Sequence, residues 1–395
     1  MAKCILTIAA PNGVPIHYME PSLVLFRSAE LMKKFVTAAL ATALAGSVSF
    51  ADPGDNEWLE LDSEINNLAT NLRPAKDGNG WSALIRATYA YSGDEIATGD
   101  PTASDVGHLD LDDVDLAFWG AVGEYSWRIS VDIDGDAPGS DVAGLEDAYV
   151  TWACGDSFTA TMGNFKASVL HSNMIDPENQ LMIDRTALGS AFDNWDAGAG
   201  AHGSWEDISW YASFQNGADA SASANWAVRV EMDLGEEMAA MEGAMGGGEQ
   251  LNASVGLSYV LDDSSTGGEQ SYFADVNGNM GPIGFGGEVG MIGDNVTNLA
   301  TGSDWSHTAA PVAFSGDSTP WGFTGSYLVN EKVEIGLRYE DLDNAAGNTI
   351  LSFVANWYQA EHNAKWQAQW SSFGADGANP DGSIFQVGVV VGASR

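Results

Sequence analysis

The sequence predicts an all-β fold: a transmembrane antiparallel β-barrel of about 16 strands over residues 81–395. Three observations predict it. Segments of about ten residues alternate apolar and polar side chains, which is the period of a strand. Tight connections alternate with long ones, as in barrels that have short turns on one side of a membrane and longer loops on the other. An export signal near the N-terminus gives access to an outer membrane.

The N-terminal region precedes this barrel. Residues 32–51 combine a basic start, an apolar run and small residues before a cleavage site, which is typical of a signal peptide rather than a short buried helix. A misassigned start codon, with Met32 as the true first residue, explains the upstream extension 1–31 most simply. Residues 52–80 are predicted to form a short helix and a linker, because 55–72 has leucine and isoleucine at helical spacing.

Each predicted strand has one apolar and one polar face. In 125–134, apolar side chains from Tyr125 to Ile133 alternate with polar ones from Ser126 to Asp134. Many segments have the length that a tilted strand needs to cross a bilayer, and aromatic side chains near their ends are typical of the membrane interface. No helical pattern separates them, which excludes a parallel α/β sheet. The predicted strands are 82–91, 111–120, 125–134, 145–154, 157–163, 196–203, 207–215, 224–234, 251–261, 270–277, 281–291, 320–329, 332–340, 349–359, 363–371 and 383–392.

Composition excludes several classes of function. The 395 residues include 55 acidic and 15 basic side chains, a net charge of −40, which argues against binding to nucleic acid. Two cysteines exclude a disulfide framework or a Cys-type zinc site, and the six histidines show no metal-ligand spacing. No hydrolase, metalloprotease or P-loop motif occurs, so we expect no enzymatic activity. Residues 198–203 satisfy G-x-G-x-x-G, but a strand follows instead of the helix that a dinucleotide site requires.

The polar strand faces are expected to line a water-filled lumen with an acidic excess. Five basic residues are assigned to this lining: Arg86, Arg128, Arg229, Arg338 and Lys365. Ten acidic residues are assigned to it: Asp113, Asp115, Asp132, Asp134, Asp147, Glu231, Asp233, Glu288, Glu334 and Glu340. Because anion selectivity needs rings or ladders of Lys and Arg, this lining predicts a preference for cations or neutral solutes.

Part of the chain resembles the phosphate-selective porin O and P family, most clearly over about 111–215. Residues 145–152 (LEDAYVTW) resemble the family's "LkDAYlty" strand, and 161–166 (TMGNFK) are similar to its "vGqfKeP" turn. Asp184-Arg185 stands at the place of its Glu-Arg pair, and 193–203 resembles its "grdiGvqlsG" return. The resemblance implies a 16-stranded outer-membrane barrel, trimeric, narrowed by inward-folded loops and passing anions.

Three features depart from the family pattern. Ala167 stands where the family has a proline, and the chain ends GASR without the aromatic residue typical of outer-membrane barrels. The acidic lining also departs from phosphate selectivity, so an anion-selective or phosphate-selective porin is kept here as the alternative.

Residues 164–195 form the predicted constriction, because they make one long loop with charges of both signs. The candidate constriction residues are Lys166, His171, Asp176, Glu178, Asp184 and Arg185. Arg185 could instead be a structural partner of Asp184 or of a wall carboxylate such as Asp147. The alternative for the whole loop is an extracellular loop with no role in the pore. The Met- and Gly-rich stretch 235–250 predicts a flexible surface loop.

The acidic turns suggest a second hypothesis, a secreted calcium-binding β-protein or adhesin. Asp132-Ile-Asp-Gly-Asp136 begins like an EF-hand loop, but Ala137 and Ala143 occupy the positions that need glycine and glutamate. We therefore expect no resident metal or cofactor, only loosely bound Ca²⁺ at acidic loops. The expected partners of the porin are the outer-membrane bilayer, small solutes or ions, and two further copies of the chain in a homotrimer.

Overall fold

The computed structural model describes residues 79–394, except 93–105, 134–143, 155–157, 206, 217–224, 236–239, 263–268, 294–313, 315, 345–346 and 375–381. The predicted extension, signal peptide and 55–72 helix lie outside the described residues, as does Asp134. Among the residues described, no helix is long and apolar enough to cross a membrane.

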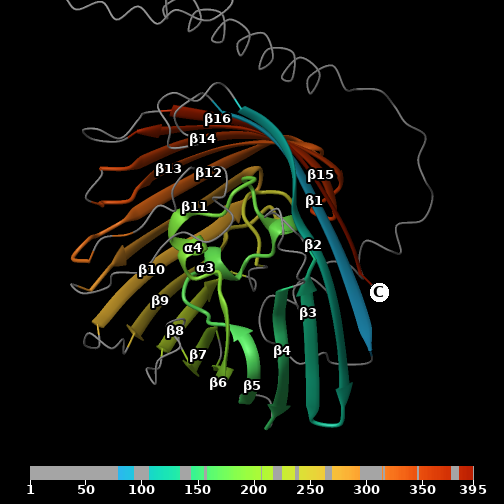
Figure 1. Ribbon diagram of the computed structural model, residues 1–395, viewed down its shortest axis with the longest axis vertical. Coiled ribbons are helices and arrows are strands. Elements are labelled where there is room, and N and C mark those ends of the chain that lie inside the picture. Colours follow the sequence, from blue (N-terminus) through green and yellow to red (C-terminus); the bar gives the residue numbers. More distant parts are fainter. Residues whose placement is uncertain are drawn as a thin grey trace, which may run out of the picture. The chain divides into compact units, whose positions relative to one another are not determined.

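The described strands close into one antiparallel barrel in sequence order, and the last strand pairs with the first (Figure 1). They are β1 (Gly80–Ser92), β2 (Val106–Val122), β3 (Tyr125–Asp132), β4 (Gly144–Ala153), β5 (Thr159–Lys166), β6 (Trp195–Trp205), β7 (Ile208–Gln215), β8 (Asn225–Leu234), β9 (Asn252–Asp262), β10 (Glu269–Met280), β11 (Ile283–Met291), β12 (Trp321–Asn330), β13 (Val333–Asp341), β14 (Thr349–Ala360), β15 (Ala364–Gly374) and β16 (Gly382–Ser394).

Each predicted strand corresponds to one observed strand, so the predicted fold class is confirmed. The largest differences are in β2 and β10, which are longer than expected. β2 begins at Val106 because its pairing with β1 continues to Ser92, and β10 reaches Met280 at a two-residue turn. Gly281 in that turn has φ +55, a conformation that glycine adopts without steric cost.

The outward face of the barrel is apolar. Ile85 and Val391 lie opposite each other on β1 and β16 and are about half exposed, and Leu337 on β13 is exposed to a similar degree. Exposed tryptophans occur around the wall at Trp81, Trp152, Trp226, Trp321, Trp357 and Trp366. Lipid covers such a surface in a transmembrane barrel. Trp119 differs from these tryptophans: it also lies near a strand end, where the sequence predicts an interfacial aromatic residue, but it pairs with Arg128 and shares its lumenal face.

Two β-bulges place extra carboxylates in the lumen. Arg86 pairs with Asp113 and Ala87 with Leu111, which leaves Asp112 as an additional residue of β2. The second bulge lies between β3 and β4, where Ile129 pairs with Ala148 and Val131 with Leu145. Glu146 and Asp147 therefore both lie opposite Ser130. A bulge adds a residue to one strand without changing the faces of the others.

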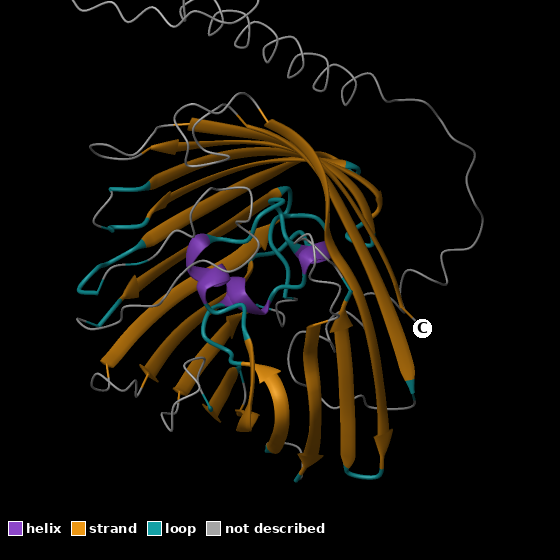
Figure 2. Cartoon of the chain, viewed as in Figure 1, coloured by secondary structure: helices purple, strands orange, loops and turns teal. Residues whose placement is uncertain are grey.

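The segment between β5 and β6 folds into the barrel (Figures 1 and 2). It contains three short helical turns, α3 (His171–Met174), η1 (Pro177–Asn179) and α4 (Ala187–Ala191). Its buried apolar side chains form two clusters with side chains of the barrel. Val169, Leu170 and Leu188 pack in one with Phe273, Ile292 and Ile350, and Leu181 and Met182 pack in the other with Val354. The alternative of an external loop is therefore wrong about its position. We call residues 167–194 the constriction loop.

A second segment, between β8 and β9, also lies inside the barrel. Its residues from Ala240 to Met245 are buried, so the expectation of a surface loop is wrong for 240–245, whereas Gly246 and residues 248–250 are exposed. The reason is close backbone packing: Gly243 has φ +90, and a Cβ at Gly284 of β11 would lie 2.4 Å from the Gly243 carbonyl carbon. We call residues 240–250 the second loop.

Candidate pore constriction

Basic side chains of the wall hold the backbone of the constriction loop. Four of them donate hydrogen bonds to its carbonyl groups: Arg86 Nη1 to Ile183 (2.7 Å), Arg229 Nη1 to Val169 (2.9 Å), Arg338 Nη1 to Asp184 (2.7 Å) and Lys365 Nζ to Gln180. All four residues are buried, at 3% exposure or less. Four of the five predicted basic lining residues therefore contact the loop instead of an open channel.

Acidic and amide side chains of the barrel wall accept hydrogen bonds from the constriction loop. Glu340 Oε1 accepts the backbone N–H of Ala187 at 2.7 Å, and Gln369 Oε1 accepts that of Ile183 at 2.7 Å. Glu288 Oε2 accepts the hydroxyl of Ser172 at 2.6 Å. These acceptors satisfy polar groups that the loop would otherwise bury unpaired.

Three of the predicted constriction residues have structural contacts. Arg185 is 2% exposed and donates to the carbonyls of Ser172 (2.5 Å) and Ile175 (2.6 Å) and to Asp193 Oδ2 (3.1 Å). Asp193 is thus a carboxylate partner of Arg185 that the sequence did not suggest. Lys166 forms an ion pair with the same Asp193. The third residue, His171, is buried against Asn277, with 2.9 Å between Nε2 and Nδ2.

The other three predicted constriction residues, Asp176, Glu178 and Asp184, are partly exposed inside the barrel. Burial and the neighbouring Asp176 raise the pKa of Glu178 to about 8, although Lys365 acts in the opposite direction. Burial also raises the pKa of Asp176, against the charges of Arg128 and Lys166. Asp176 and Glu178 therefore titrate nearer to neutral pH than free carboxyl groups do.

Strands β2–β4 together carry seven partly exposed acidic groups. These are Asp110, Asp112, Asp113, Asp115, Asp132, Glu146 and Asp147. Carboxylate oxygens of Asp115, Asp132 and Glu146 all lie within 4.8 Å of one another. Arg128, the fifth predicted basic lining residue, remains partly exposed and donates from Nε to Asp147 Oδ2 at 2.7 Å. The open part of the lumen is therefore lined by many carboxylates and few cations.

The remaining predicted lining residues divide between structural and exposed positions. Glu231 pairs with Arg229 at 2.5 Å, and Glu334 is fully buried, where it accepts the N–H of Ala244 (2.6 Å) and the hydroxyl of Tyr358 (2.8 Å). Asp233 lies on the lumenal side of β8 and is partly exposed. The prediction placed these residues on the correct face of their strands. It did not distinguish residues that hold other parts of the structure, such as Glu334, from residues that water reaches, such as Asp233.

Three acidic residues inside the barrel were not predicted from the sequence: Asp112, Glu146 and Glu242. Strict alternation assigns Asp112 and Glu146 to the lipid side, where a carboxylate is costly. Two consecutive acidic residues within a strand, Asp112-Asp113 and Glu146-Asp147, were the signal available, because a bulge is the arrangement that turns both inward. Glu242 carries no such signal, since its role depends on contacts with distant residues.

Comparison with known proteins supports the fold alone. No protein-family model matches the chain, and no curated protein matches it. Among solved structures, the anion-selective porin from Comamonas acidovorans has a TM-score of 0.56 at 12% identity, covering 80% of this chain and 99% of that one. The outer membrane channel DcaP of Acinetobacter baumannii has a TM-score of 0.54 at 12% identity, with 81% and 99% covered. A loop-deletion mutant of OmpT from Vibrio cholerae has a TM-score of 0.53 at 10% identity, with 80% and 100% covered. The chain therefore has the fold of outer-membrane porins.

Proposed function

We propose that this chain is a porin of the bacterial outer membrane that lets small hydrophilic solutes or ions diffuse passively, with a preference for cations and neutral solutes. It acts as a channel and not as an enzyme. The observation that carries the proposal is the division of charge inside the barrel: Arg86, Arg229, Arg338 and Lys365 are buried against the constriction loop, whereas the carboxylates of β2–β4 stay partly exposed.

The selectivity follows from where the charges are, because a permeating ion responds most to groups at a narrow point that water reaches. On the loop side these groups are Asp176, Asp184 and, above about pH 8, Glu178. On the wall side they are the carboxylates around Arg128. A cation passing between them meets favourable potential along most of its path. The same carboxylates attract Ca²⁺ loosely, and no resident cofactor is needed.

Planar-bilayer recording of the refolded mature chain tests both parts of this proposal. We expect stepwise conductance, and a reversal potential in a salt gradient whose sign shows cation preference. Absence of any stepwise conductance would contradict the channel. A strong anion preference would contradict the charge argument and favour the alternative, an anion-selective or phosphate-selective porin of the resembled family.

Fractionation separates the porin from the secreted calcium-binding protein. The apolar outward face favours the porin, since an exported water-soluble protein has no reason to expose it. We expect the chain to remain with detergent-solubilised outer membranes and to withstand high salt and chelator. Release by chelator would favour the adhesin.

We also expect a homotrimer, and cross-linking in intact membranes measures its size.

A further inference from the structure

We infer that the second loop, residues 240–250, is a second wall of the constriction, and that Glu242 is the residue that positions it. This inference rests on the proposed channel function. The second loop connects β8 to β9 at the end of the barrel where the connections are otherwise tight, such as Gly281-Pro282 and Glu331-Lys332. Transmembrane barrels keep short turns at that end, so an inward-folded loop there is an added element.

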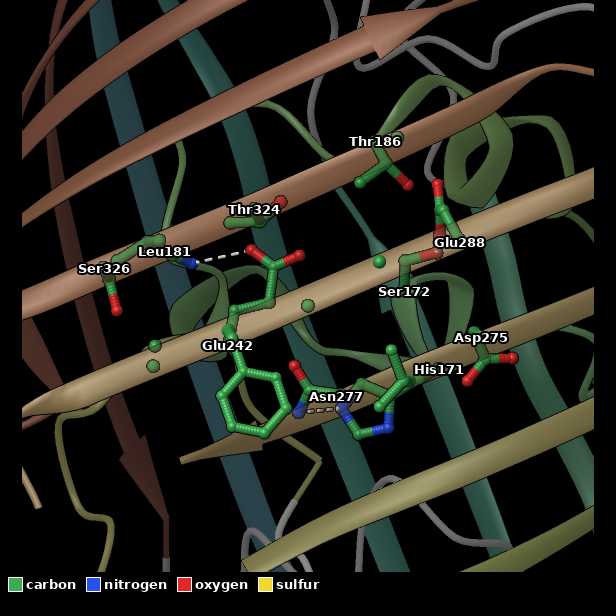
Figure 3. Close-up of a pocket in the computed structure, with 17 residues that line it drawn as sticks. His171, Ser172, Leu181, Thr186, Glu242, Asp275, Asn277, Glu288, Thr324 and Ser326 are labelled. Carbon is green, nitrogen blue, oxygen red and sulfur yellow. Dashed lines mark hydrogen bonds between the residues drawn. The ribbon is translucent and has the colours of Figure 1, made fainter. Parts of the chain in front are cut away.

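Glu242 joins the second loop to both the constriction loop and the wall. Its Oε2 accepts the backbone N–H of Leu181 at 3.0 Å (Figure 3). The same oxygen accepts a hydrogen bond from Arg338 Nη2 at 3.0 Å, and Oε1 lies 3.2 Å from that nitrogen. Arg338 in turn holds the carbonyl of Asp184. One carboxylate therefore determines where two loops from opposite ends of the barrel meet.

Other polar side chains also contact the second loop, and one of them, His362, contacts both loops. His171 and Asn277 both lie against the carbonyl of Met241, at 3.4 and 2.9 Å. His362, in the turn between β14 and β15, contacts the carbonyls of Glu178 (3.2 Å) and Met245 (3.2 Å), one on each loop. The second loop is thus fixed by polar contacts on both of its flanks.

The junction between the loops is polar and incompletely filled. A cavity of about 30 Å³ lies between them and β10–β12, with His171, Ser172, Thr186 and Glu242 on its border. That space holds about two water molecules. Hydrated polar contacts exchange more readily than a close-packed apolar core, so loss of one charged contact is expected to loosen the second loop instead of unfolding the barrel.

A glycine on β11 allows the backbone of the second loop to approach the barrel wall closely. A Cβ at Gly284 would lie 2.4 Å from the carbonyl carbon of Gly243 and 2.6 Å from its Cα. It would also lie 2.4 Å from Oγ of Ser326 on β12, but that side-chain atom can rotate away, whereas the backbone of Gly243 must move. Two residues along the same lumenal face, a Cβ at Gly286 would meet its nearest atom at 3.4 Å, an ordinary contact. These two positions therefore provide a test and its control within one strand.

Four variants test the inference by single-channel recording. Glu242→Gln replaces one accepting oxygen by an NH₂ group and adds no bulk, and Gly284→Ala displaces the second loop sterically. We expect both to raise conductance and to add frequent partial closures, while the barrel still assembles and unfolds in urea in one cooperative transition. Glu331→Gln, a charge change in the exposed β12–β13 turn at the same end of the barrel, and Gly286→Ala are the controls and should match the wild type.

The outcomes separate the two proposals. Wild-type protein without conductance contradicts the channel itself. A conducting wild type whose Glu242→Gln and Gly284→Ala variants show the same conductance and noise as the controls overturns the role of the second loop alone. If Gly284→Ala does not assemble, Glu242→Gln decides, because its side chain has the same size as the original.

Discussion

At the scale of single residues, the lumen contains two kinds of ionisable group that look alike in the sequence. Arg229 on β8 and Arg128 on β3 both lie on the lumenal face of their strands. The side chain of Arg229 is 1% exposed, however, whereas that of Arg128 is 17% exposed. Arg229 binds Asp275 through two hydrogen bonds of 2.5 and 2.9 Å and also holds the loop carbonyl of Val169. Burial, and not residue type, decides which one acts as an anchor.

Replacement of these two arginines by methionine should affect stability very differently. Arg229→Met leaves Asp275 buried without its partner, which costs about 3–5 kcal/mol in comparable buried pairs. Arg128→Met breaks a partly exposed pair and should cost only about 0–1 kcal/mol. Equilibrium unfolding in urea, with the barrel in lipid vesicles, measures both values. Equal losses would contradict the assignment of Arg229 as an anchor.

Glu178 gives the channel a dependence on pH. Burial raises its pKa to about 8, so the carboxyl group is neutral below that pH and charged above it. The lumen therefore becomes more negative as pH rises from 7 to 9, and the ratio of cation to anion permeability should increase over this window. Reversal potentials at each pH measure it. Glu178→Gln should remove the increase, whereas Glu249→Gln should keep it; a wild type without the increase would contradict the prediction.

At the scale of elements, the sequence predicted strands well and bulges not at all. Alternation is a local property, so each of the 16 strands was predictable from its own residues. A bulge depends on the neighbouring strand, as does the inward position of the second loop, whose Gly- and Met-rich sequence suits mobile loops equally well. For the same reason the constriction loop was found, but Arg185 was assigned to the pore when its contacts are within the loop.

Deletion of single residues of β4 tests whether Glu146 is the extra residue of a bulge. Without Glu146, Asp147 alone would lie opposite Ser130, and every other residue of β4 would keep its face. Without Val150, which is part of the regular ladder, the residues before it would change faces and Asp147 would face lipid. We therefore expect the Glu146 deletion to assemble and the Val150 deletion to fail. Refolding yield, followed by circular dichroism and heat-dependent gel mobility, measures both; failure of both deletions would contradict the bulge.

At the scale of the whole molecule, the net charge of −40 acts on permeating ions only through the carboxylates that water reaches. Their combined potential extends over about 10 Å at 0.1 M salt and about 3 Å at 1 M. The preference for cations should therefore decrease steadily between these two concentrations, as reversal potentials at a fixed salt ratio will show. Charge reversal at Asp113, Asp132 and Glu146 together should lower the preference most at low salt. A preference that is independent of salt would contradict selection by lumenal charge and would indicate selection by the dimensions of the constriction.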